Sequence, residues 1–190
     1  MVNPIFFNIK LQDIKLSGLL VILILLTDIK MRDKRFITEH RGGSLKKEQH
    51  KQLIKWACEC AEHILPLFGE KLDVRLENAI LIAKEWEKGR TTVGDAMKAS
   101  VDAHAVARES SNPISIAVAR AIGHAVATAH MADHSLGCPL YALKAVKHAG
   151  GSVDEEREWQ KKQLKQLQLP SEIVELVLIT MMKKEKSLKI

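Results

Sequence analysis

The sequence predicts an all-α fold, a single-domain bundle of about six to seven antiparallel helices with an Ala-rich central helical hairpin. Three features of the chain support this. From about residue 44 onward, apolar residues recur at spacings of three and four, as on a helix with one buried face. Residues that start and stop helices recur between these stretches. No stretch of the body alternates with the period of two that a strand requires, and short connections make consecutive helices antiparallel neighbours.

The first helix is expected to begin at the N-cap Ser44 and to end near Leu65, because Pro66 cannot continue it. Its buried stripe is expected to consist of Leu53, Trp56, Ala57, Cys60 and Ile64.

Capping residues place the remaining helices. Asp73 caps a second helix that Gly89 ends, and Thr92 with Asp95 forms the capping box of a third, which runs to about residue 110. Asn112 and Pro113 open a fourth helix that runs to about residue 136 and ends at Gly137. Pro139 opens a fifth that ends at Gly150, Ser152 with Glu155 opens a sixth, and the seventh spans residues 172–182.

The chain divides into a leader at residues 1–30, a helical domain at 31–182 and a Lys-rich tail at 183–190. The leader's apolar run from Ser17 to Leu26 is about half the length of a membrane span, and no small-residue cleavage site follows it. A disordered segment, an additional helix or strand, and a natural start of synthesis at Met31 all remain open. The leader contains no Ala and is rich in Ile and Leu, which favours Met31.

The net charge of +6 lies at the ends of the chain, because residues 51–182 hold 16 basic and 17 acidic side chains. A nucleic acid is therefore a disfavoured partner, and aromatic residues, at 4%, are too few for a surface that stacks single strands. Three cysteines rule out a disulfide framework and suit a reducing compartment.

The central helix is unusually poor in charge. Between residues 110 and 143 the formal charges are those of Arg120 and Asp133 alone, so the helix should be buried on most sides. Positions in the third and fourth helices that sum to about 223 should face each other, which predicts an ion pair between Asp102 and Arg120. The candidates for a polar core or pocket are Asp102, His104, Arg120, His124, His130, Asp133 and His134.

His130 and His134 are four residues apart and would share a helix face, which is half of a zinc motif. Met131 stands where that motif has its catalytic Glu, and zinc needs at least three protein ligands. On a continuous helix His124 would lie too far from His134 to join it, and Asp133 would point about 100° away. We therefore predict no catalytic residue, cofactor or metal site, and His130 and His134 are only weak metal candidates.

Several strings of the chain resemble a known family. They are MRDKRF at 31–36, EHRGG at 39–43, AKEW at 83–86, GHAVATAHMADH at 123–134, YALKAV at 141–146 and EWQ at 158–160. Together they resemble the small all-helical bacterial immunity proteins of polymorphic toxin systems, over about residues 31–182. The resemblance implies a helical, cytoplasmic protein whose partner is a protein toxin, and it implies no catalytic residues. The leader, extra residues around 161–169 and the Lys-rich tail depart from the family.

The function that follows is an immunity protein that binds and neutralises a toxin. One alternative is a small helical enzyme that uses the His-rich helix, with or without a metal. This would require His124, His130 and His134 to converge on an open cleft with a third ligand. A nucleic-acid binder that uses the basic termini ranks third. No membrane association is expected, and a homo-oligomer remains open.

Overall fold

The structure is a computed structural model that describes residues 33–69, 71–188 and 190. Its described part contains seven α-helices: α2 (Lys47–His63), α3 (Val74–Glu87), α4 (Val93–Glu109), α5 (Pro113–Ala127), α6 (Gly137–His148), α7 (Val153–Gln166) and α8 (Ser171–Leu188). Four short 3-10 turns accompany them: η1 (Lys34–Phe36), η2 (Glu39–Arg41), η3 (Leu65–Phe68) and η4 (Ala132–Leu136). The predicted all-α fold is confirmed. The leader at residues 1–30 lies outside the described residues. No described helix has the length and apolarity to cross a membrane.

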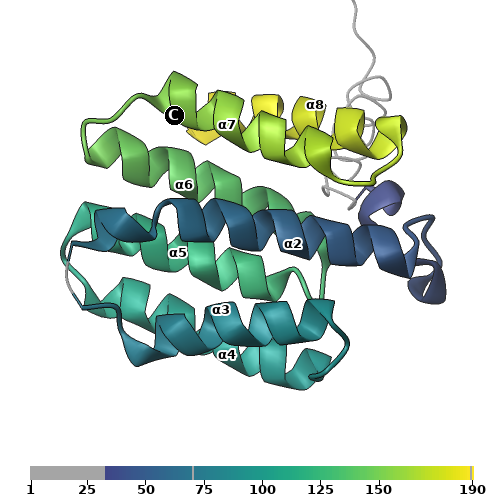
Figure 1. Ribbon diagram of the computed structural model, residues 1–190, viewed down its shortest axis with the longest axis horizontal. Helices are drawn as coiled ribbons and strands as arrows, with labels where there is room; N and C mark the ends of the chain where they lie inside the picture. Colours follow the sequence, from purple (N-terminus) through teal and green to yellow (C-terminus); the bar gives the residue numbers. More distant parts are fainter. Residues whose placement is uncertain (1–32, 70, 189) are drawn as a thin grey trace, which may run out of the picture. The chain divides into compact units, whose positions relative to one another are not determined.

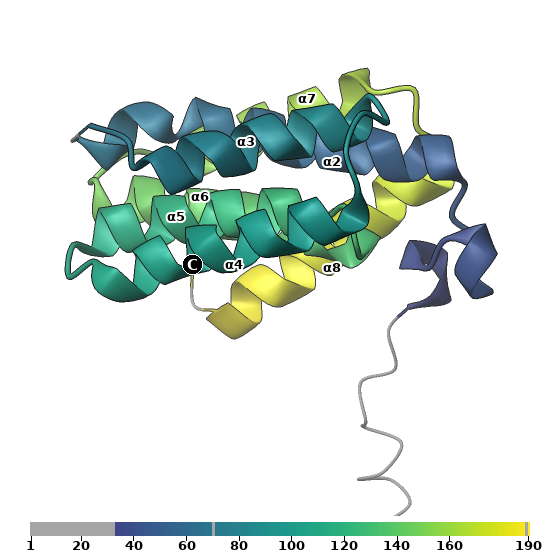
Figure 2. The ribbon, with the colours of Figure 1, turned by 90° about the horizontal axis from the view of Figure 1, so that it is seen from below.

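Helix α5 lies at the centre of the bundle (Figure 1). It contacts α2, α3, α4 and α6, and α8 packs against α6 and α7. In the view of Figure 2, α3 and α7 lie above α5 and α8 lies below it. Most of α5 is buried, and its buried side chains are mainly Ala, Val and Ile. The low charge of this stretch therefore reflects its central position, as the sequence predicts.

The predicted caps are present in the structure. Thr92 and Asp95 bond reciprocally, because Thr92 Oγ1 accepts from Asp95 N at 3.1 Å and Asp95 Oδ2 accepts from Thr92 N at 3.2 Å. Asp73, Asn112 and Ser152 also accept hydrogen bonds from backbone N–H groups in the first turns of α3, α5 and α7. Each cap satisfies a backbone donor that has no partner within its own helix.

The predicted fourth helix is wrong at its C-terminal end. Helix α5 ends at Ala127, a turn follows, and α6 begins at Gly137 rather than at Pro139. The Thr128 hydroxyl donates to the His124 carbonyl at 3.0 Å, and Met131 has an extended backbone with φ −151°. The chain therefore leaves the helix after Thr128 and re-enters helical structure only at η4.

Two other boundaries differ from the prediction. Helix α2 begins at Lys47, three residues after the expected N-cap Ser44, where Gln49 Oε1 accepts from Lys46 N at 2.8 Å. Helix α8 continues to Leu188, so most of the Lys-rich segment 183–190 is helical. Arg157 Nε donates to Glu185 Oε2 at 2.8 Å and attaches this last part of α8 to α7.

The predicted buried face of α2 is confirmed, since Leu53, Trp56, Ala57, Cys60 and Ile64 are each at most 1% exposed. The Cys138 thiol of α6 donates to the Ala57 carbonyl at 2.9 Å. Burial raises the pKa of the Cys60 and Cys138 thiols well above the ordinary value, so both act as neutral core groups.

The predicted register of α4 against α5 is also confirmed. Ser100 Oγ donates to the Gly123 carbonyl at 3.1 Å, and these two positions sum to 223. The helices come close because Gly123 has no side chain: a Cβ there would lie 2.6 Å from the His104 ring. Gly137 has the same role between α5 and α6, since a Cβ there would lie 2.5 Å from the His124 ring.

We predict that Gly137→Ala lowers the free energy of unfolding by about 1–3 kcal/mol, the usual cost of overpacking. The added methyl would meet the part of the His124 ring nearest its own backbone, which side-chain rotation cannot clear easily. Urea denaturation measures the effect. Gly94→Ala is the matched control, because the nearest atom to its Cβ, Thr92 Oγ1, is 3.5 Å away. Equal stability of the two variants would contradict the packing argument.

Candidate functional site

Four histidines form a row across the α4, α5 and η4 region, and we call them the histidine row: His104, His124, His134 and His130. The ring centroids are 5.2 Å apart between His104 and His124, 5.5 Å between His124 and His134, and 4.8 Å between His134 and His130. The expectation that His124 lies too far from His134 is therefore wrong. The break after Ala127 turns the chain back, so His130 and His134 approach α5 instead of continuing along it.

The four residues of the histidine row are half-buried. Burial, followed by the charges of Arg120 and Arg108, lowers the pKa of His104 to about 4. Burial, followed by the neighbouring His104 and His134, lowers the pKa of His124 to about 3. Both rings are therefore neutral near pH 7. The Nδ1 atoms of His104 and His124 are buried and have no hydrogen-bond partner among the residues that the structure describes. Tyr141 stacks on His124 with the ring centroids 5.3 Å apart.

The predicted ion pair between Asp102 and Arg120 is absent from the ion pairs of the described residues, although the helices have the predicted register. Both side chains are half-buried. Arg120 lies close enough to His104 and His124 to lower the pKa of each ring.

Asp133 lies in η4 and is also half-buried. Within the described part of the chain, no three His, Cys, Asp or Glu side chains form a group that could hold a metal.

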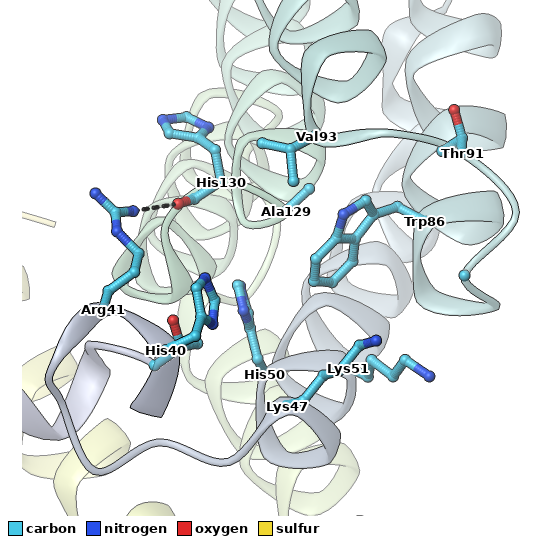
Figure 3. Close-up of a pocket in the computed structure, with 12 residues that line it drawn as sticks. His40, Arg41, Lys47, His50, Lys51, Trp86, Thr91, Val93, Ala129 and His130 are labelled. Carbon is cyan, nitrogen blue, oxygen red and sulfur yellow. Dashed lines mark hydrogen bonds between the residues drawn. The ribbon is translucent and has the colours of Figure 1, made fainter.

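A cavity of about 470 Å³ lies at the His130 end of the histidine row, and we call it the basic cavity (Figure 3). Its walls come from the turn before α2, the start of α2, the end of α3, the α3–α4 connection, the start of α4 and the turn after α5. The lining residues are Thr38, His40, Arg41, Lys47, His50, Lys51, Trp86, Gly89, Thr91, Val93, Ala129 and His130. His130 belongs to both the row and the cavity.

The turn before α2 holds Arg41 at the edge of the basic cavity. Thr38 and Leu45 form an isolated bridge that closes the turn, and Gly42 reverses the chain with φ +81°. A Cβ on Gly43 would lie 1.8 Å from the Ile37 carbonyl oxygen, so the closed turn requires glycine there. Arg41 Nη1 donates to the His130 carbonyl at 3.0 Å (Figure 3), which connects the turn to the end of the histidine row.

His50 forms part of the inner wall of the cavity. Its ring contacts Trp86 with the centroids 4.9 Å apart. His50 Nε2 lies 2.5 Å from the Thr128 carbonyl, and because a carbonyl only accepts, Nε2 carries a proton and donates it. Burial is the main cause that lowers the pKa of His50. His50 is therefore neutral near pH 7 and ties α2 to the turn after α5.

Among the described residues, the lining of the basic cavity carries three fixed cations, Arg41, Lys47 and Lys51, and contains no carboxylate. Two nearby acids offset part of this charge, since each bonds to a lining residue. Glu48 lies 3.5 Å from Lys51, and Asp95 accepts from the Thr91 and Thr92 hydroxyls at 3.0 and 2.6 Å. The cavity is therefore a positively charged recess suited to an anionic group.

Sequence reasoning predicted the members of the histidine row but not the basic cavity. Of the cavity's residues, only His130 is among the candidates, whereas His40, His50 and Trp86 come from segments far apart in the sequence. One feature of the sequence did point to the cavity. The strings EHRGG, AKEW and GHAVATAHMADH, on which the family resemblance rests, each supply lining residues to this one cavity.

The chain matches the family described as Imm-5 like putative immunity protein over residues 43–167, well over half of its length. The chain belongs to this family. No curated protein and no solved structure matches it.

The histidine row makes a prediction about acid stability. Above pH 6.5 the rings are neutral in both the folded and the unfolded chain. As the pH falls from 6.5, His104 and His124 become protonated in the unfolded chain. In the folded chain they stay neutral until the pH reaches about 4 for His104 and about 3 for His124. Stability should therefore decrease with falling pH over this window. The His104→Gln and His124→Gln variants should show a shallower decrease than the wild-type protein.

Urea denaturation at several pH values between 7 and 4 measures this slope, and comparison with the wild type cancels the titration of carboxylates. His148→Gln is the control, because its ring is exposed at the end of α6. If both His104→Gln and His124→Gln kept the wild-type slope, the row would not be the source of acid sensitivity.

Proposed function

We propose that this protein is an immunity protein that binds a partner toxin and neutralises it in the bacterial cytoplasm. The observation that carries the proposal is membership of the Imm-5 like family over residues 43–167. The structure adds a surface that would suit a protein partner.

That surface lies on α4. Val93, Met97 and Val101 are 42%, 49% and 61% exposed, and their spacing of four places them along one side of the helix. Exposed apolar side chains gathered in this way are typical of surfaces that partners cover. Val93 also lines the basic cavity, so the apolar stripe of α4 begins at the cavity. A toxin seated here would contact both features.

The enzyme alternative has less support. It requires three histidines to converge on an open cleft, but within the histidine row His130 lines the cavity while the rings of His124 and His134 pack against each other. Tyr141 covers another side of His124. This arrangement resembles core packing more than a reaction centre.

Co-expression tests the proposal directly. The genes that adjoin this one are expressed singly in a sensitive host, with and without the protein, to find one whose product is a toxin. We expect the protein to restore growth and to co-purify with the toxin as a stoichiometric complex. Growth arrest in its presence, with no complex, would contradict the proposal.

We predict that Met97→Glu weakens toxin binding by about tenfold or more, because a charge would replace an apolar contact at the interface. Isothermal titration calorimetry measures the dissociation constant. Met182→Glu is the matched control: this side chain is 54% exposed, but it lies on α8, outside the residues that match the family. Equal affinities of the two variants would remove α4 from the interface. The free protein could also prove to be a dimer that Met97→Glu converts to a monomer. That result would contradict a toxin interface on α4, because a second copy of the chain would then cover this face.

A further inference from the structure

We infer that the basic cavity receives a carboxylate side chain from the toxin, as the anchor of a segment that continues along the apolar stripe of α4. This inference rests on the proposed function and names the recognition chemistry of the partner. Two neighbouring features support the inference. The described wall of the cavity holds cations and no acid, and the exposed apolar face of α4 begins beside it.

The cations are among the more exposed residues of the cavity wall. Arg41 and Lys47 are exposed and Lys51 is half-buried, whereas His50, Thr38 and Ala129 are buried deeper in the wall. Lys47 is the first residue of α2, so the positive end of that helix lies at the same place. An entering carboxylate would therefore meet positive charge at the mouth of the cavity before it loses its water.

Arg41 is the best-placed group for a directed contact. One of its donors is used by the His130 carbonyl, which fixes the guanidinium at the edge of the cavity. A guanidinium has five N–H donors in a fixed fork that matches the two oxygens of a carboxylate. The bond to His130 therefore positions Arg41 and leaves further donors for a ligand.

The rest of the wall favours a side chain on a polypeptide over a small free anion. Trp86, Val93 and Ala129 supply apolar surface beside the cations, which suits the methylene groups and backbone around an acidic residue. The volume of about 470 Å³ exceeds what a single phosphate ion needs. The apolar stripe then continues from Val93 to Met97 and Val101, where the flanking residues of the same segment would lie.

The first experiment uses the full chain without toxin. The peptide acetyl-Ala-Asp-Ala-amide, its Asn analogue and inorganic phosphate are titrated separately, and the ring proton signals of His40, His50 and His130 are followed by NMR. We expect the Asp peptide to shift these signals more than that of the exposed His148, with millimolar affinity. The Asn peptide should have little effect. Equal shifts from the Asn peptide would overturn the inference, and tighter binding of phosphate would make the cavity a small-anion site instead.

The second experiment measures toxin affinity at several salt concentrations. We expect the double variant Lys47→Gln/Lys51→Gln to bind at least about tenfold more weakly than the wild type and to show a flatter salt dependence, because it removes cations from the cavity. Arg90→Gln is the control, since Arg90 is a 67%-exposed cation that lies 3.8 Å from Glu85 and does not line the cavity. Circular dichroism checks that the variants are folded.

The two experiments separate the two claims. If the toxin binds the wild type and the double variant equally well, the carboxylate inference fails while the proposed function stands. If the toxin does not bind the wild type at all, the proposed function fails, and the peptide titration alone decides whether the cavity takes a carboxylate.

Discussion

The close packing of two imidazole rings against two glycines is the constraint on which the centre of the fold depends. Gly123 makes room for the His104 ring and Gly137 makes room for the His124 ring, so α4, α5 and α6 approach one another with the rings between them. A methyl group at either glycine would occupy the space of a ring atom. The rings are kept neutral by burial, which makes polar side chains acceptable between helices otherwise packed through Ala and Val.

The end of α5 connects this core to the surface. A helix that continued through residue 136 would carry His130 and His134 away from His124. Because the chain turns after Thr128, His134 returns to the His124 ring and His130 reaches the basic cavity. The carbonyls that the turn exposes are used by the protein itself: His50 donates to that of Thr128, and Arg41 donates to that of His130. The same break therefore builds the histidine row and ties together two walls of the cavity.

The helices and their caps could be predicted from the sequence because their causes are local, as with Thr92 and Asp95, or periodic, as with the buried face of α2. The α4–α5 register followed from a short connection. The break after Ala127 could not be predicted in this way, since Thr128 to Leu136 contains no Pro or Gly and tertiary packing overrides its helical pattern. The cavity was missed for a related reason: Arg41, His50 and Trp86 meet only through the fold. Asp102 shows that correct register does not ensure an ion pair.

The family membership, the apolar stripe of α4 and the basic cavity together support one account, in which the toxin binds where the stripe meets the cavity. The most direct measurement is a structure of the complex with the toxin that the protein neutralises. The account predicts a toxin Asp or Glu carboxylate within hydrogen-bond distance of Arg41, Lys47 or Lys51, with Met97 buried beneath the same toxin segment. A complex in which the toxin contacts another face and the cavity remains open to solvent would contradict it.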